Sequence, residues 1–146
     1  MYVKLFNQTI EVIQDEIGIK EMFFSDEKNV HYEINSEVQK QLTEYEQGKR
    51  KVFNLALHLK GTDFQKLVWN ALLAIPFGET RSYQEIAVQI GRPKALRAVG
   101  GACNRNPIGI IVPCHRVIGK NGNLTGYAGG LWYKELLLKH ENDGKL

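Results

Sequence analysis

Cysteine is scarce in this sequence: only Cys103 and Cys114 occur among 146 residues, and the first 60 residues contain none. Two cysteines do not make the disulfide framework of a small secreted scaffold. Long apolar runs are also missing, since none approaches the ~20 residues of a membrane span. The N-terminal residues lack the charged and apolar segments of a signal peptide. We therefore expect a cytoplasmic protein with both thiols reduced.

Metal ligands are equally sparse. A structural zinc site in the first 60 residues would need more cysteine than this region has, so its two histidines are expected to be structural or surface residues. Cys103, Cys114 and His115 are an alternative ligand set, but Pro113 and the apolar flanks of Cys114 do not resemble a zinc knuckle. We predict that the protein binds no metal and needs no cofactor.

Acidic residues are depleted in one part of the chain. Between Gly78 and Lys120 there are seven Lys and Arg residues and only two acids, a net charge of +5 in a chain whose total is +3. We call this segment the basic block. Positive charge confined to one segment is typical of a surface that binds a polyanion. A solvated surface with a chance excess of basic residues is the alternative.

The sequence pattern of residues 1–60 predicts a small strand-rich lobe. Residues 10–13 and 19–24 are β-favouring runs separated by a short polar turn, which predicts a hairpin. Residues 30–34 and 52–57 are predicted to be two further strands. Between these two, a capping box and an apolar stripe predict a helix, marked by Ser36, Val38, Gln39, Leu42, Tyr45 and, at its end, Gly48.

Helical patterns dominate the rest of the chain. Capping boxes at Thr62–Gln65 and Ser82–Glu85 predict two helix starts, and Gly91 is expected to end the second helix. A third helix follows from Pro93 to about Cys103, so that the second and third helices form a helix-turn-helix. A last helix is expected over Leu131–His140, with its leucines buried and Glu141 at its end. An acid there is unfavourable under the helix dipole unless a cation lies nearby.

The predicted third helix has two glycines in its middle. Leu96, Val99 and Cys103 are expected to face the core, and Gly100 and Gly101 each cost about 1 kcal/mol relative to alanine in a helix interior. Close approach of a bulky partner such as a nucleic-acid backbone would explain the missing side chains. Close packing against another helix is the structural alternative.

Cys114 lies in the segment Ile110–Ile118, which reads IIVPCHRVI. The apolar flanks predict a buried strand or extended segment that would hold the cysteine in a fixed orientation. The adjacent histidine and arginine would favour its thiolate. For a lone cysteine, an ordinary buried core residue is the alternative interpretation.

Several segments between Phe64 and Glu141 together resemble the O6-alkylguanine-DNA alkyltransferases, also called methylated-DNA–protein-cysteine methyltransferases. The resemblance implies an α+β fold. It consists of a small N-terminal, ribonuclease-H-like lobe over residues 1–60 and a C-terminal, winged-helix-like lobe with the helix-turn-helix over residues 61–146. The segments that carry the resemblance are Phe77-Gly78-Glu79, Ser82-Tyr83-Gln84, Arg97 to Ala102, Asn106-Pro107, Pro113 to Val117, Gly126-Tyr127 and His140-Glu141.

The activity that the resemblance implies is direct-reversal DNA repair. Cys114 would take the alkyl group from O6-alkylguanine permanently, so each molecule would act once; activity on O4-alkylthymine is left open. His115 would serve as the base through water, Glu141 would orient the imidazole, and Asn106 would brace the active-site turn. This arrangement is analogous to other nucleophile–histidine–acid triads.

The partner implied is double-stranded DNA, bound by a monomer through the minor groove with the damaged base flipped out. Arg97 would fill the vacated place in the stack, and Tyr83 would crowd the neighbouring phosphate and donate to the guanine. The residues expected to contact DNA or the base are Ser82, Tyr83, Arg97, Gly100, Gly101, Val117, Tyr127 and Ala128. Some family members have serine at the position of Ala128, so the resemblance predicts no preference for alkyl size.

Two rival functions are compatible with parts of the pattern. A helix-turn-helix module without chemistry would explain the basic block but not the Cys114-His115 pair. A thiol hydrolase would use the same pair but would turn over repeatedly.

Overall fold

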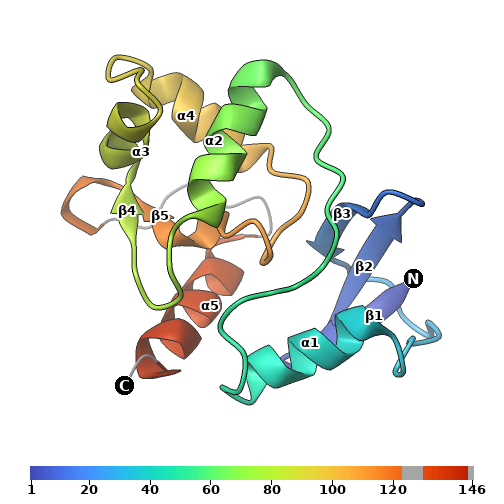
Figure 1. Cartoon of the computed structure of the whole chain (residues 1–146). Helices are drawn as coiled ribbons and strands as arrows, with labels where there is room; N and C mark the ends of the chain where they lie inside the picture. Colours follow the sequence, from blue (N-terminus) through green and yellow to red (C-terminus); the bar gives the residue numbers. More distant parts are fainter. Residues whose placement is uncertain (123–129, 145–146) are drawn as a thin grey trace. The chain divides into compact units, whose positions relative to one another are not determined.

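In the computed structural model, residues 1–122 and 130–144 are described, and they combine helices with two small sheets (Figure 1). The α+β class is therefore confirmed. The chain divides into two compact units, Met1–Leu59 and Lys60–Leu146. None of the described helices is both long and apolar enough to cross a membrane.

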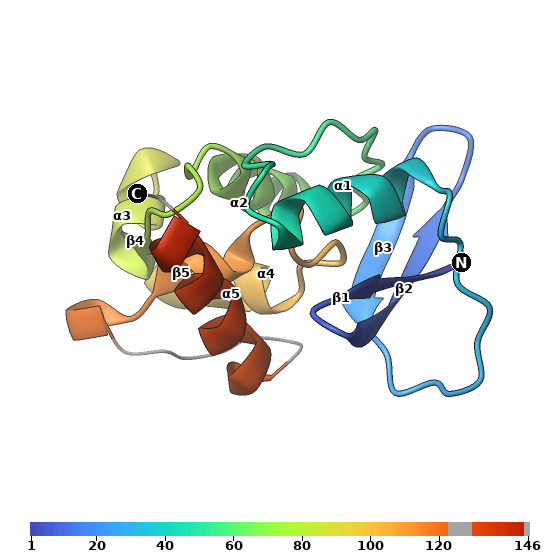
Figure 2. The same cartoon turned by 90° about the horizontal axis from the view of Figure 1, so that it is seen from below.

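The first unit is an antiparallel sheet with one helix. Strands β1 (Tyr2–Leu5), β2 (Gln8–Gln14) and β3 (Ile19–Phe24) pair in that order. The predicted hairpin of β2 and β3 is confirmed. Helix α1 (Glu37–Glu46) begins at its Ser36 cap and packs against β1 (Figure 2). The core of this unit consists of alternate strand residues and the predicted helical stripe, namely Val3, Leu5, Ile10, Val12, Ile19, Met22, Val38, Leu42 and Tyr45.

Two predicted strands of this unit are wrong. Residues 30–34 and 52–57 each make only an isolated bridge, Tyr2 with Tyr32 and Ile19 with Leu57. Instead β1, which was not predicted, pairs with β2 across a tight turn at Phe6 and Asn7, both with positive φ. Because β2 is thereby paired on both sides, neither of the two predicted strands can pair with it.

The second unit is mainly helical. Both capping boxes predicted for it are present, and Gly91 has φ +74° at the end of the second helix, as predicted. The two short strands of this unit pair in parallel and hold the cysteine-containing turn next to the start of a helix. Its elements are α2 (Asp63–Leu73), β4 (Arg81–Ser82), α3 (Tyr83–Gln89), α4 (Leu96–Asn104), η1 (Cys114–Arg116), β5 (Val117–Ile118), η2 (Lys120–Gly122) and α5 (Leu131–Gly144).

Details of the helix-turn-helix differ from the prediction. Helix α4 begins at Leu96 instead of Pro93, because residues 92–95 form a turn closed by the Ala95 amide and the Arg92 carbonyl. Leu96, expected in the core, is 46% exposed; the buried stripe is Val99, Ala102 and Cys103. Leu131, at the start of α5, is likewise 48% exposed.

Candidate active site

Cys114 opens a single 3₁₀ turn instead of lying in the predicted strand or extended segment. The turn spans Cys114–Arg116, and its Arg116 amide donates to the Pro113 carbonyl at 2.9 Å. Strand β5 follows at once and pairs with β4. Cys114 is 6% exposed, so a protein interior surrounds the thiol on nearly all sides.

Asn106 links this turn to the end of α4. Its Nδ2 donates to the Val112 carbonyl at 2.8 Å, and its Oδ1 accepts from the Ile108 amide at 3.0 Å. Burial raises the pKa of Cys114, while a hydrogen bond from Asn106 and the Lys134 ammonium act in the opposite direction. The asparagine therefore braces the backbone before the cysteine and also favours the thiolate.

His115 and Glu141 form a buried pair beside the cysteine. Nε2 of His115 lies 2.7 Å from Oε2 of Glu141, and the two residues are 0% and 1% exposed. Burial lowers the pKa of His115 against the opposing pull of Glu141. Glu141 is buried too, yet its hydrogen bonds and attraction to His115 and Arg116 hold its pKa well below the usual range. Burial thus favours the neutral form of the imidazole, and the partners of Glu141 favour its ionised form.

The cation that Glu141 needs in the last turn of α5 is Arg116, which the sequence analysis placed beside the thiol but did not pair with Glu141. Nε of Arg116 donates to Oε1 of Glu141 at 2.7 Å, and its Nη2 donates to Oε2 at 3.1 Å. Arg116 is only 6% exposed. It counts toward the basic block of the sequence but contributes little to its surface charge.

Lys134 is a second buried cation that the sequence did not single out. It is 0% exposed, and its Nζ donates to the Val117 carbonyl at 2.6 Å and lies 5.9 Å from the centre of the Tyr83 ring. Burial lowers its pKa. The carbonyl of Val117, a residue expected to contact DNA or the base, thus already accepts one hydrogen bond; a carbonyl has a second lone pair for another donor.

A groove of about 950 Å³ runs along α4 and the start of α3. A Cβ placed at Gly100 or Gly101 would meet no heavy atom of the described residues within 4 Å. The described residues therefore do not pack closely against these glycines, and none of them supports the structural alternative. The groove is lined by Ser82, Tyr83, Gln84, Leu96, Arg97, Gly100, Gly101, Asn104, Gly119 and Lys120.

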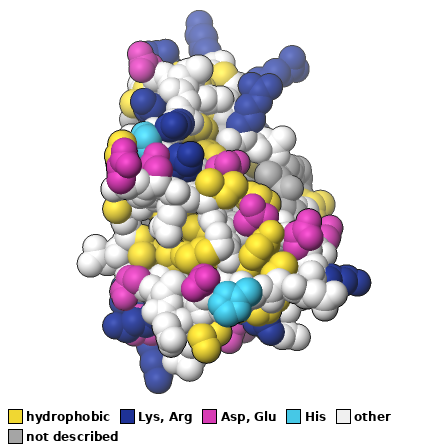
Figure 3. Space-filling model, turned by 90° about the vertical axis from the view of Figure 1, so that its right-hand side faces the viewer, with side chains coloured by type: hydrophobic (Ala, Val, Ile, Leu, Met, Phe, Trp, Pro, Cys, Tyr) yellow, Lys and Arg dark blue, Asp and Glu magenta, His cyan; other side chains and the backbone are white. Residues whose placement is uncertain are grey.

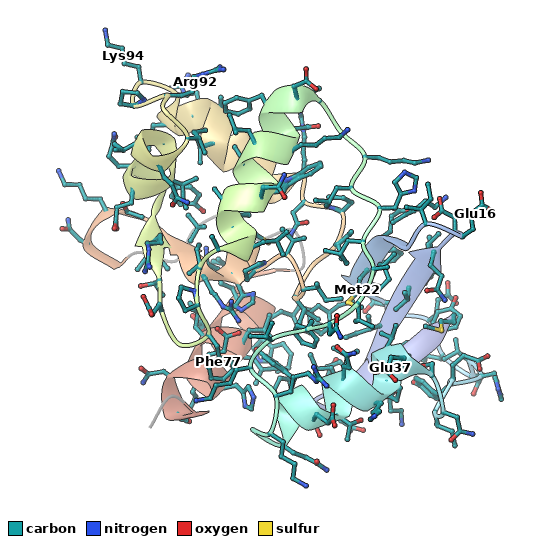
Figure 4. The ribbon with its side chains drawn as sticks, viewed as in Figure 1. Glu16, Met22, Glu37, Phe77, Arg92 and Lys94 are labelled. Carbon is teal, nitrogen blue, oxygen red and sulfur yellow. The ribbon has the colours of Figure 1, made fainter. Side chains whose placement is uncertain are left out.

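Positive charge is exposed around the helix-turn-helix. Arg92 and Lys94 extend away from the ribbon at the α3–α4 turn (Figure 4). Figure 3 shows several Lys and Arg side chains projecting from the end of the surface at its top. The basic block thus presents part of its charge to solvent, as a polyanion-binding surface would.

A family profile described as "6-O-methylguanine DNA methyltransferase, DNA binding domain" matches residues 63–143. The chain belongs to this methyltransferase family. The methylated-DNA–protein-cysteine methyltransferase of Methanosarcina acetivorans is 52% identical over 97% of this chain and 98% of its own length. The one from Mycobacterium tuberculosis is 61% identical over 69% of this chain and 61% of its own length.

Solved structures agree with this membership. The Mycobacterium tuberculosis methyltransferase OGT in complex with DNA has a TM-score of 0.83 at 45% identity, covering 93% of this chain and 88% of that one. Schizosaccharomyces pombe Atl1, in complex with damaged DNA containing O6-carboxymethylguanine, has a TM-score of 0.51 at 31% identity over 56% of this chain and 78% of that one. The fold of this methyltransferase is therefore one that has been solved with DNA bound.

The structure of this methyltransferase brings the predicted site residues together in two groups. One surrounds the thiol, and the other lines the groove. Tyr127 and Ala128 lie outside the described residues. The group around the thiol is Cys114, His115, Glu141, Asn106 and Val117, and the groove group is Ser82, Tyr83, Arg97, Gly100 and Gly101.

Proposed function

We propose that this protein repairs O6-alkylguanine in double-stranded DNA by moving the alkyl group onto Sγ of its own Cys114. The observation that carries the proposal is the buried Cys114–His115 turn, in which Glu141 holds the far nitrogen of the imidazole at 2.7 Å. A cysteine needs such a base because only a few per cent of a free thiol is ionised near neutral pH. Membership in the methyltransferase family supports the choice of substrate.

The proton of Cys114 has a defined destination in this mechanism. Since Nε2 of His115 is held by Glu141, Nδ1 remains to accept the proton through a water molecule, and Nδ1 makes no hydrogen bond to any described residue. The sulfur then bonds to the alkyl carbon as the carbon–oxygen bond breaks, and the released electron pair goes to guanine, which takes up a proton. The resulting thioether offers water no activated carbonyl, so each molecule acts once.

DNA recognition in the proposal uses the groove along α4. A base inside a duplex is out of reach of a buried thiol, so the damaged nucleotide must be flipped out at a cost of a few kcal/mol. We propose that α4 enters the minor groove and that Arg97 occupies the place left in the stack, while Gly100 and Gly101 give clearance to the backbone. The protein is proposed to act as a monomer in the cytoplasm, where both of its free thiols stay reduced.

Intact mass measurement tests the proposal. After incubation with a duplex that contains O6-methylguanine, the protein should gain the mass of one methylene group, and peptide mapping should place it on Cys114. Cys114→Ala should bind the lesion duplex without gaining mass. Cys103→Ala, which removes the other buried thiol, is the matched control and should be methylated like the wild type. An unchanged wild-type mass, or methylation elsewhere, would refute the proposal.

A further inference from the structure

All three guanidinium nitrogens of Arg116 donate hydrogen bonds. Besides its two hydrogen bonds to Glu141, its Nη1 donates to the Ile75 carbonyl at 2.7 Å. The ring of Phe77 lies 5.9 Å from the guanidinium carbon. Figure 4 shows Phe77 on the loop after α2, beside α5. A side chain anchored at so many points cannot reach DNA, so its charge acts inside the site.

The contacts of Glu141 connect Arg116 to the proposed base. Arg116 engages both carboxylate oxygens, and Oε2 also receives Nε2 of His115. A planar guanidinium that grips two oxygens fixes the plane of the carboxylate as well as its position. The carboxylate in turn selects the tautomer with the proton on Nε2, which leaves Nδ1 of His115 as an acceptor.

The positive charge of Arg116 also affects the protonation of His115. A buried carboxylate beside an imidazole, with no other cation present, favours the imidazolium, which has no lone pair to accept a proton. Here Arg116 already neutralises Glu141. Besides burial and Glu141, the charges of Arg116 and Lys134 act on the pKa of His115, and both lower it. Among the described residues, the charged groups that act on the pKa of His115 are thus Glu141 and Lys134 from α5 and Arg116 from η1.

We propose that Arg116 is a positioning residue for alkyl transfer: it clamps Glu141 and keeps His115 in the neutral form that can accept the proton of Cys114. This inference rests on the proposed function. It assigns to the arginine of the Cys-His-Arg turn a role in the proton path and none in DNA binding.

The test measures how the rate of the transfer step depends on pH. Wild type, Arg116→Met and Arg116→Lys are each saturated with an O6-methylguanine duplex, so that DNA affinity does not enter the rate. Arg116→Met should move the acidic limb of the profile upward by about one pH unit, because the remaining carboxylate then holds a proton on His115. Arg116→Lys keeps the charge but loses the bidentate grip, so its limb should stay near that of the wild type while its maximal rate falls.

Arg81→Met is the matched control. Arg81 also pairs with a glutamate, Glu79 at 3.0 Å, but this pair is on the surface of the same unit. Its removal should leave the profile unchanged. A purely structural role for Arg116 would lower the rate equally at every pH, so an acidic limb of Arg116→Met that coincides with the wild-type limb would overturn the inference.

A second measurement needs no folded variant. The titration of His115 in the wild type can be followed by NMR, with the ring signal assigned through the backbone resonances of the wild type itself. The inference expects a pKa below the ordinary value of 6.5. A ring that is charged at neutral pH would refute it. If the wild type were never methylated, the proposed function would fail, whereas the titration would still show whether His115 is neutral, and comparing it with the titration of Arg116→Lys and Arg116→Met would show whether Arg116 keeps it so.

Discussion

At the scale of single residues, the site depends on burying groups that carry charge. His115, Arg116, Lys134 and Glu141 all lie in the interior, where an unpaired charge would be costly. Arg116 and Glu141 neutralise each other, and Lys134 is bound to a backbone carbonyl. These buried charges are stabilised by their partners. Adding a proton to His115 or Glu141 should therefore lower the free energy of unfolding.

Acid sensitivity follows from the direction of two pKa shifts. The pKa values of His115 and Glu141 are both lowered in the folded chain, from ordinary values of 6.5 and 4.5. As pH falls, the unfolded chain takes up these protons first. The stabilisation is complete above the ordinary values and is lost progressively as pH falls below them toward the lowered pKa values of the folded chain. For His115 alone, unfolding free energy should drop by about 1 kcal/mol per pH unit just below its ordinary value.

Urea unfolding at about pH 7.5 and about pH 5.5 measures this loss. His115→Gln should show a smaller difference between the two conditions than the wild type. His31→Gln, at a side chain that is 87% exposed, is the control and should keep the wild-type difference. Equal pH dependence in His115→Gln and wild type would contradict the assigned shift.

The site residues that were predicted from the sequence are next to each other in the chain or lie in segments that resemble the family. Cys114 and His115 stand next to each other, and the family segments around them pointed to Glu141 and Asn106. Arg116 was predicted to lie beside the thiol and was counted in the basic block, but it was not paired with Glu141, and Lys134 was not considered. Their burial is decided by partners far along the chain, Glu141 at 25 residues and Val117 at 17 residues. Composition and spacing do not carry that information.

At the scale of elements, local signals predicted helix starts better than strand pairing. Ser82–Glu85 and Thr62–Gln65 form reciprocal capping boxes because all their partners lie within four residues. Ser36 caps α1 as well, but here the predicted capping box is incomplete. The Gln39 side chain bonds to the backbone of Lys4 instead of the backbone amide of Ser36. Strands need distant partners, so the β-favouring texture of residues 30–34 and 52–57 did not suffice.

Trp69 fixes α4 against α2. Its indole Nε1 donates to the Ala102 carbonyl at 2.9 Å, and the side chain is 2% exposed. Trp69→Phe removes this donor and leaves a cavity, so the unfolding free energy should fall by about 1–3 kcal/mol. Trp132→Phe, at a site 58% exposed, should change it by about 0.5 kcal/mol or less. Chemical denaturation of the two variants compares them directly, and equal losses would exclude the assigned role.

The glycines of α4 should separate stability from DNA binding. Because space is open at both positions, Gly100→Ala and Gly101→Ala should each raise the unfolding free energy by up to about 1 kcal/mol. The added methyl groups point into the proposed DNA groove, so affinity for a lesion duplex should fall.

Gly48→Ala provides the opposite control. Gly48 has φ +75° in the other unit, so this variant should lose about 1 kcal/mol of stability and keep its DNA affinity. The measurements are denaturant unfolding and fluorescence anisotropy with labelled duplex. Unchanged affinity in both α4 variants would show that DNA does not approach these glycines.

At the scale of the whole molecule, the described groups of the proposed chemistry all belong to the unit Lys60–Leu146. The thiol, the histidine–glutamate pair, Asn106 and the α4 groove lie in this part of the chain, and the family profile matches residues 63–143. The motifs from which the sequence analysis inferred chemistry also lie in this part of the chain. In the proposed function Cys114 is the nucleophile, which sets a limit on the capacity of each molecule.

That limit predicts a stoichiometry. If the thioether on Cys114 is permanent, titrating a fixed amount of protein with excess O6-methylguanine duplex should give a plateau of about one methyl group per chain, because no group regenerates the thiol. A second addition of substrate to the same protein should yield no further repair, whereas fresh protein should restart it. The readout is restored guanine, quantified by chromatography after digestion of the DNA. Repair well beyond one lesion per chain would mean that the Cys114–His115 pair works as a hydrolase. In a thiol hydrolase, water attacks the covalent intermediate and releases the thiol. Repeated turnover would therefore require His115 to activate a water molecule after the transfer, and the alkyl group on Cys114 would not be permanent.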